Sequence, residues 1–355
     1  MLRRILNLLG GGLAVTEKQI LNQVFVYVVN QGDNSISLYT IGSQGHLLPH
    51  ETRKIRSGTT PVHIEAAPDG KSVYVANQGG NNISQFRVGA DGVLQPANKP
   101  VAAGTTPVHL AFHPSGEYAY VANSSSNDIA QYTVGCDGSL HPMATPLVSA
   151  GLIPVWISVH PAGKFAYVAN NGSSDISLFQ IRHDGSLDMV DKAVAKAGTG
   201  PRCMVIDPVG RYAYVANRTS GDVSIYRIEG DGKLNLQGKP VLTGKHPISL
   251  CLSPSGKFAY VVNQNGNSIS QFSVDASGNL QPMEPAAVIS VMTPVGVTLD
   301  ATGRYLYVAN ISSNDVSQYR LAENGSLEPI ILNNWGDFAV TADVAPRAVA
   351  VVTLP

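Results

Sequence analysis

The chain repeats one pattern of apolar and polar positions seven times. Each copy carries the phrase Tyr-Val-x-Asn inside a short apolar run, and successive asparagines lie 47, 46, 47, 47, 46 and 47 residues apart. The repeated asparagines are Asn30, Asn77, Asn123, Asn170, Asn217, Asn263 and Asn310. A period of this length is typical of one blade of a β-propeller. The sequence therefore predicts an all-β fold, a seven-bladed β-propeller built from four-stranded blades.

One copy shows how a blade is expected to fold. We expect strands at residues 107–112, 118–123, 129–134 and from 140 onward. Turn residues separate them, and Asp137-Gly138 predicts a tight hairpin of type I′, in which both central residues need positive φ. A leucine lies two residues after the hairpin glycine in every copy, and we interpret these leucines as core between blades.

The two ends of the repeat complement each other. The first copy lacks a first strand that begins with proline and enters at Phe25–Asn30, whereas the last residues, Pro346–Val352, form a spare first strand. Pairing them would close the ring and remove an exposed sheet edge. Residues 24–355 are therefore predicted to form one propeller domain.

The N-terminal residues 1–23 have two interpretations. Arg3 and Arg4 precede a short apolar run, as in the remnant of a secretory signal, but Asn7 and several glycines interrupt it. The alternative is an arm that packs on the propeller. The sequence favours a cytoplasmic location, with a periplasmic or exported protein as the alternative.

The last repeat carries an insertion around Trp335. The final step between prolines that begin first strands is 52 residues, from Pro294 to Pro346. A loop with Trp335 and Phe338 could contact a protein partner, or it could pack over the closing seam. Both interpretations stay open.

Composition excludes several classes of function. The net charge is −1 and only 14% of the 355 residues are charged, so no basic surface for nucleic acid is expected. No stretch is long and apolar enough to cross a membrane as a helix. The three cysteines lack the spacing of a metal site, and we expect no metal and no cofactor.

Three phrases carry a resemblance to a known family. Phe165-Ala-Tyr-Val-Ala-Asn170, Asp184-Gly-Ser-Leu187 and Gly200-Pro-Arg202 resemble the propeller lactonases, whose best-known member is bacterial 6-phosphogluconolactonase. The resemblance covers residues 24 to 352. It implies a hydrolase of sugar lactones in carbohydrate metabolism, with His, Glu and Arg side chains around one mouth of the central channel.

The family's polar positions are only partly kept. The resemblance places its conserved Arg on Arg202, but its His falls on Val155, its Glu on Arg218 and its second Arg on Gln264. Lactone opening needs a general acid or base and a stabilised oxyanion, so these replacements argue against efficient hydrolysis.

The starts of the first strands are expected to converge on one mouth of the channel. This places candidate side chains there from five repeats: His63, His109, Trp156, Arg202 and Arg347, joined by Arg218 and Gln264 from the turns after second strands. Two hypotheses follow. In the first, the site binds a small anionic or sugar-derived ligand, or a protein partner, without catalysis. In the second, it is a rearranged lactone hydrolase in which His63 or His109 is the base and Arg202 stabilises the oxyanion.

Overall fold

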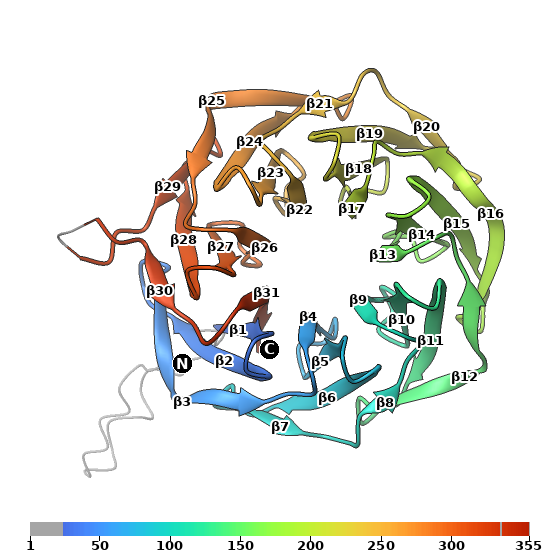
Figure 1. Cartoon of the computed structure of the whole chain (residues 1–355), viewed down its shortest axis with the longest axis horizontal. Helices are drawn as coiled ribbons and strands as arrows, with labels where there is room; N and C mark the ends of the chain where they lie inside the picture. The colour runs from blue at the N-terminus through green and yellow to red at the C-terminus, as the bar shows by residue number, and fades with distance from the viewer. Residues whose placement is uncertain (1–23, 334–335, 355) are drawn as a thin grey trace, which may run out of the picture.

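The predicted propeller is confirmed. A computed structural model describes residues 24–333 and 336–354, and in these residues every regular element is a β-strand. Figure 1 shows seven sheets arranged like spokes around a central channel. No described segment is a helix that could span a membrane.

Each blade runs from an inner strand at the channel to an outer strand at the rim. The inner strands are β4 (Pro61–Ala66), β9 (Pro107–Phe112), β13 (Pro154–Val159), β17 (Pro201–Ile206), β22 (Pro247–Leu252), β26 (Pro294–Leu299) and β31 (Pro346–Thr353). The second strands are β1 (Val24–Asn30), β5 (Ser72–Asn77), β10 (Tyr118–Asn123), β14 (Phe165–Asn170), β18 (Tyr212–Asn217), β23 (Phe258–Asn263) and β27 (Tyr305–Asn310). The third strands are β2 (Ser35–Ile41), β6 (Asn82–Val88), β11 (Asp128–Val134), β15 (Asp175–Ile181), β19 (Asp222–Ile228), β24 (Ser268–Val274) and β28 (Asp315–Leu321).

The outer strands differ between blades. Four are continuous: β3 (Leu47–Arg56), β12 (Leu140–Ser149), β16 (Leu187–Lys196) and β25 (Leu280–Ile289). Three are split into β7 (Leu94–Pro96) with β8 (Val101–Ala102), β20 (Leu234–Leu236) with β21 (Val241–Leu242), and β29 (Leu327–Pro329) with β30 (Ala339–Thr341). Two of the breaks contain a proline, Pro100 or Pro240, which has no N–H for the ladder.

The repeat Tyr and Leu residues join neighbouring blades. The Tyr of each Tyr-Val-x-Asn phrase is fully buried, and its hydroxyl donates to the carbonyl of a hairpin glycine in the next blade, as Tyr260 does to Gly325 at 2.6 Å. The leucine after each hairpin is also buried, for example Leu327. This confirms the leucines as core between blades.

The repeat asparagines brace the turn after the second strand. Asn77 is fully buried, and its amide donates to Asn82 and to Ser84, both at 2.8 Å. Its side-chain oxygen accepts from the backbone N–H of Gly58 at 3.1 Å. The equivalent asparagines Asn123, Asn170 and Asn217 bond to the same turn in their own blades.

The hairpin at Asp137-Gly138 forms, but the type I′ prediction is wrong. Gly138 has φ of 81°, whereas Asp137 is not among the residues with positive φ. The N–H of Gly138 donates to the carbonyl of Gly135, and the N–H of Gly135 donates to that of Ser139. This is a three-residue loop that ends in a left-handed glycine. Asp137 accepts from the N–H of Ser139, which favours the observed turn.

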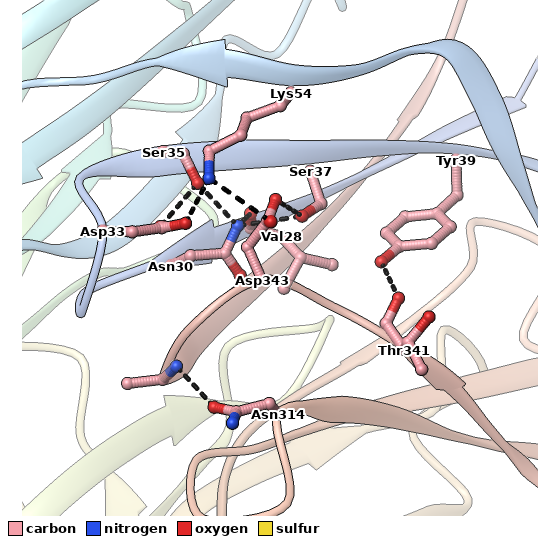
Figure 2. Close-up of polar contacts among 11 residues, drawn as sticks. Val28, Asn30, Asp33, Ser35, Ser37, Tyr39, Lys54, Asn314, Thr341 and Asp343 are labelled. Carbon is pink, nitrogen blue, oxygen red and sulfur yellow. Dashed lines mark hydrogen bonds and ion pairs between the residues drawn. The ribbon is translucent and has the colours of Figure 1, made fainter.

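The closure of the ring is confirmed. Strands β1 and β31 pair antiparallel, with Tyr27 opposite Ala350. Figure 2 shows the seam beside this blade, where Ser37 donates to Asp343 at 3.0 Å and Tyr39 donates to the carbonyl of Thr341 at 2.7 Å. Contacts between residues about 300 positions apart therefore fix the first blade to the last one.

Two sequence expectations lie partly outside the described residues. Residues 1–23, read as an arm or a remnant signal, are not described, and neither is Trp335. Of the insertion, Phe338 packs against Tyr319 with ring centroids 5.7 Å apart. That contact favours packing of this part of the loop on its own blade.

Candidate functional site

A β-bulge begins every inner strand at the mouth of the channel. In β17, Pro201 lies opposite Asn217 and Cys203 lies opposite Ala216, so Arg202 has no partner of its own. The same shift follows Pro346 in β31 and leaves Arg347 unpaired. A bulge redirects the side chain of its extra residue. Here the bulged residue of each inner strand lines the channel.

The residue type at the bulge differs between two repeats and the other five. Five of them are apolar: Val62, Val108, Val155, Ile248 and Val295. The other two are Arg202 and Arg347. Two cations therefore occupy positions that are aliphatic elsewhere in the repeat, which argues that these arginines do more than fill the ring.

One wall of the channel is an aromatic stack. His109 lies on Trp156 with ring centroids 3.6 Å apart and an interplanar angle of 30°, and His63 lies 4.1 Å from His109. These side chains come from β4, β9 and β13, which are neighbours in Figure 1. They line a narrow cleft of about 110 Å³ that also contains Arg202 and Arg347.

The two histidines differ in their capacity for acid–base chemistry. Burial and the nearby His63 lower the pKa of His109 well below 6.5, and its Nδ1 faces the N–H of Ile157 at 3.5 Å. His109 is therefore a neutral ring in the wall. The Nε2 of His63 lies 3.2 Å from the carbonyl of Leu110 and 3.5 Å from Glu65. Because a carbonyl only accepts, Nε2 carries a proton and donates to Leu110.

The opposite wall opens into a polar pocket of about 280 Å³. Its lining consists of Asn171, Arg202, Arg218, Ile248, Gln264 and Arg347. Arg218 donates to the side-chain oxygen of Gln264 at 3.4 Å. Arg202 and Arg347 belong to both the pocket and the cleft, so the two spaces are continuous.

The positive charges of the three arginines in the pocket repel one another. Burial, together with Arg347 and Arg218, lowers the pKa of Arg202 from 12.5 to about 10. Burial and Arg218 lower the pKa of Arg347 as well. Among the described residues, no carboxylate forms an ion pair with any of the three arginines. Arg side chains that are largely withdrawn from solvent normally have an anionic partner, and the described residues supply none here.

The structure thus brings all seven candidate side chains to one end of the channel. It also adds two that the sequence reasoning missed, Glu65 and Asn171. Glu65 lies two positions after His63 on the same strand, so the period of two could have found it. Asn171 occupies the repeat position of Arg218 and Gln264. Cys203, which follows Arg202 on β17, is fully buried, and burial raises its pKa to about 12.

Seven blades, bulged inner strands and a polar site at the mouth of the channel define the class of this protein, a seven-bladed propeller. The sequence profile of the family described as "Lactonase, 7-bladed beta-propeller" matches residues 19–105, 93–251 and 240–334. The chain belongs to this lactonase family, as the resemblance in the sequence implied. The comparison with curated proteins gives no match.

Solved structures show the same fold at low sequence identity. A protein of Bacteroides uniformis, provisionally named a 6-phosphogluconolactonase, is 20% identical with a TM-score of 0.81, and the match covers 93% of this chain and 100% of that one. The periplasmic gluconolactonase PpgL of Pseudomonas aeruginosa is 23% identical with a TM-score of 0.76, with 94% and 100% covered. At these identities the likeness establishes the fold alone.

Proposed function

We propose that this lactonase-family propeller binds a small anion, a phosphosugar or a sugar acid, in the pocket between Arg202, Arg218 and Arg347. The observation that carries the proposal is three arginines around one pocket with no carboxylate paired to them in the described chain. A bidentate contact from guanidinium to phosphate or carboxylate would offset both the burial and the mutual repulsion.

The surroundings support a sugar-derived ligand. Asn171 and Gln264 add amide donors and acceptors beside the arginines. The stacked pair His109 and Trp156 provides a flat apolar wall in the adjoining cleft. A few polar groups on an otherwise apolar wall are what a small-molecule site requires. An anionic head in the pocket and a polyol chain along the wall would use both spaces.

Calorimetric titration with 6-phosphogluconate and gluconate tests the proposal. Each charged hydrogen bond contributes about 1.5–3 kcal/mol, so Arg202→Ala and Arg218→Ala should each weaken binding by roughly ten- to a hundredfold. Arg227→Ala is the matched control, since it removes the same charge from an exposed side chain on β19. Equal affinities of wild type, Arg202→Ala and Arg227→Ala would contradict the proposal.

A second candidate is lactone hydrolysis, which the proximity of His63 and Glu65 favours. His63 would act as the base through Nδ1, and Arg202 would stabilise the oxyanion. Turnover of 6-phosphogluconolactone separates the candidates. The binding proposal predicts slow or undetectable hydrolysis. Efficient hydrolysis that is lost in His63→Ala or His109→Ala would establish the enzyme instead.

A further inference from the structure

A second and larger cleft lies at the other end of the blades. It has a volume of about 740 Å³ and lies between the blade of β5 and β6 and that of β10 and β11. Its lining includes Ser72, which begins a second strand, whereas Arg218 follows the end of one. The cleft and the arginine pocket are therefore on opposite faces of the propeller, and the chemistry of one does not involve the other.

A break in the repeat creates this cleft. In six blades, an aromatic ring at the start of the second strand covers the hairpin glycine of the next blade. These pairs are Phe25 with Gly92, Tyr118 with Gly185, Phe165 with Gly232, Tyr212 with Gly278, Phe258 with Gly325 and Tyr305 with Gly45. In the seventh pair the residue over Gly138 is Ser72. The repeat places an aromatic ring at each of the other six blade junctions, and that ring is missing here.

The walls around the missing ring are those of a ligand site. Val88 and Val134 contribute apolar surface, and the exposed Cys136 lies at the edge. The volume falls within the range that small-molecule pockets occupy, roughly 300–1,000 Å³. The backbone geometry of a ring-binding junction is kept, as the hydroxyl of Tyr74 still donates to the carbonyl of Gly138.

The charges at the rim indicate the charge of the ligand. The lining contains three acidic side chains, Asp69, Glu117 and Asp137, against Lys71 and Arg87. Asp69 and Asp137 accept from backbone N–H groups of their own turns, whereas the carboxylate of the exposed Glu117 makes no hydrogen bond or ion pair with another described residue. A cationic substituent is therefore favoured over an anionic one.

We propose that the cleft at Ser72 binds a small aromatic amine, whose ring takes the place that an aromatic side chain fills at the other six blade junctions. The ring would lie over Gly138 against Val88 and Val134, and the ammonium group would face Glu117. Nothing in this site depends on Arg202 or on the channel.

Titration with tyramine and with 4-hydroxyphenylacetate tests the proposal, because these probes share the phenol ring and differ in the sign of the side-chain charge. We expect saturable binding of tyramine that is at least fivefold tighter than that of the acid. Ser72→Phe restores the missing ring and should weaken tyramine binding more than tenfold. Ser72→Ala is the matched control, since it keeps the space open and should change the affinity less than threefold.

Alkylation of Cys136 by iodoacetamide, located by mass spectrometry, gives an independent measurement at the cleft. Saturating tyramine should slow this alkylation in wild type and in Ser72→Ala but not in Ser72→Phe. The melting temperature of Ser72→Phe should equal or exceed that of wild type, because the same ring is accommodated in six other blades. Absence of saturable tyramine binding, equal affinities of Ser72→Phe and wild type, or equal losses in Ser72→Phe and Ser72→Ala would overturn the proposal.

Discussion

Replacing Arg202 by methionine should stabilise the ligand-free protein. Methionine is similar in length, fills the same space and carries no charge. The expected change in the free energy of unfolding follows from the pKa of the Arg202 guanidinium, which is lowered from 12.5 to about 10. One pKa unit corresponds to about 1.4 kcal/mol, so the charge of Arg202 costs the native state at most about 3.5 kcal/mol.

Solvent reduces this figure, because the side chain of Arg202 is partly exposed in the open mouth of the channel. We expect Arg202→Met to raise the free energy of unfolding by about 1–3 kcal/mol at pH 7, measured by urea denaturation in a buffer without phosphate or carboxylate. Most substitutions of partly buried residues destabilise, so the sign of the effect is itself informative. The control Arg227→Met, at an exposed position, should change stability by less than about 0.5 kcal/mol.

Adding phosphate should narrow or reverse the difference in stability between the two proteins. A ligand at a hundred times its dissociation constant stabilises the native state by about 2.7 kcal/mol. Wild type should gain this stabilisation, whereas Arg202→Met, which is expected to bind ten- to a hundredfold more weakly, should gain only about 0.4–1.4 kcal/mol. If Arg202→Met is less stable than wild type without an anion, then Arg202 is satisfied within the protein, and the argument for an unfilled anion site is refuted.

Three further predictions concern the fold and its response to pH. Deletion of residues 346–355 removes the partner of β1 and should cause aggregation or a much lower melting temperature; an unchanged melting curve would disprove the closure. Tyr260→Phe removes the buried hydrogen bond to Gly325 and should lower the free energy of unfolding by about 0.5–1.5 kcal/mol in urea titrations, more than the same change at Tyr118, whose hydroxyl donates to His183 at the surface. The pKa of His109 is lowered in the native state, so as the pH falls the unfolded chain binds a proton at this residue before the native protein does. The free energy of unfolding should therefore fall below pH 6.5, by at most about 1.4 kcal/mol per pH unit from this residue. His109→Gln should lessen that dependence in urea titrations repeated between pH 7.5 and 5.

The fold could be predicted from the sequence because each local signal repeats seven times. The phrases around Tyr260 and Asn263 fix a strand and a turn in every copy, and spacing alone then sets the number of blades. The hairpin type was missed because Asp137 bonds to the N–H of Ser139 and favours a turn with a single left-handed residue. The prediction of a type I′ turn rested on the residue pair Asp137-Gly138 alone and did not include that side-chain bond.

The sequence could predict most residues of the site but not the electrostatic interactions among them. Counting from each proline placed His63 and Arg202 at one mouth, since equivalent positions in a propeller converge. The bulge that turns Arg202 toward the channel depends on pairing with β18, which the sequence does not display. The cleft at Ser72 was also missed. The sequence does not show that, in the other copies, the ring at this position contacts the hairpin of the next blade.

The central claim is that the three arginines form an anion site, and a crystal structure with saturating 6-phosphogluconate tests it most directly. The account predicts the phosphate or carboxylate group within hydrogen-bond distance of at least two of Arg202, Arg218 and Arg347. A ligand whose anionic groups avoid all three guanidinium groups, or a pocket that stays empty at saturation, would contradict it.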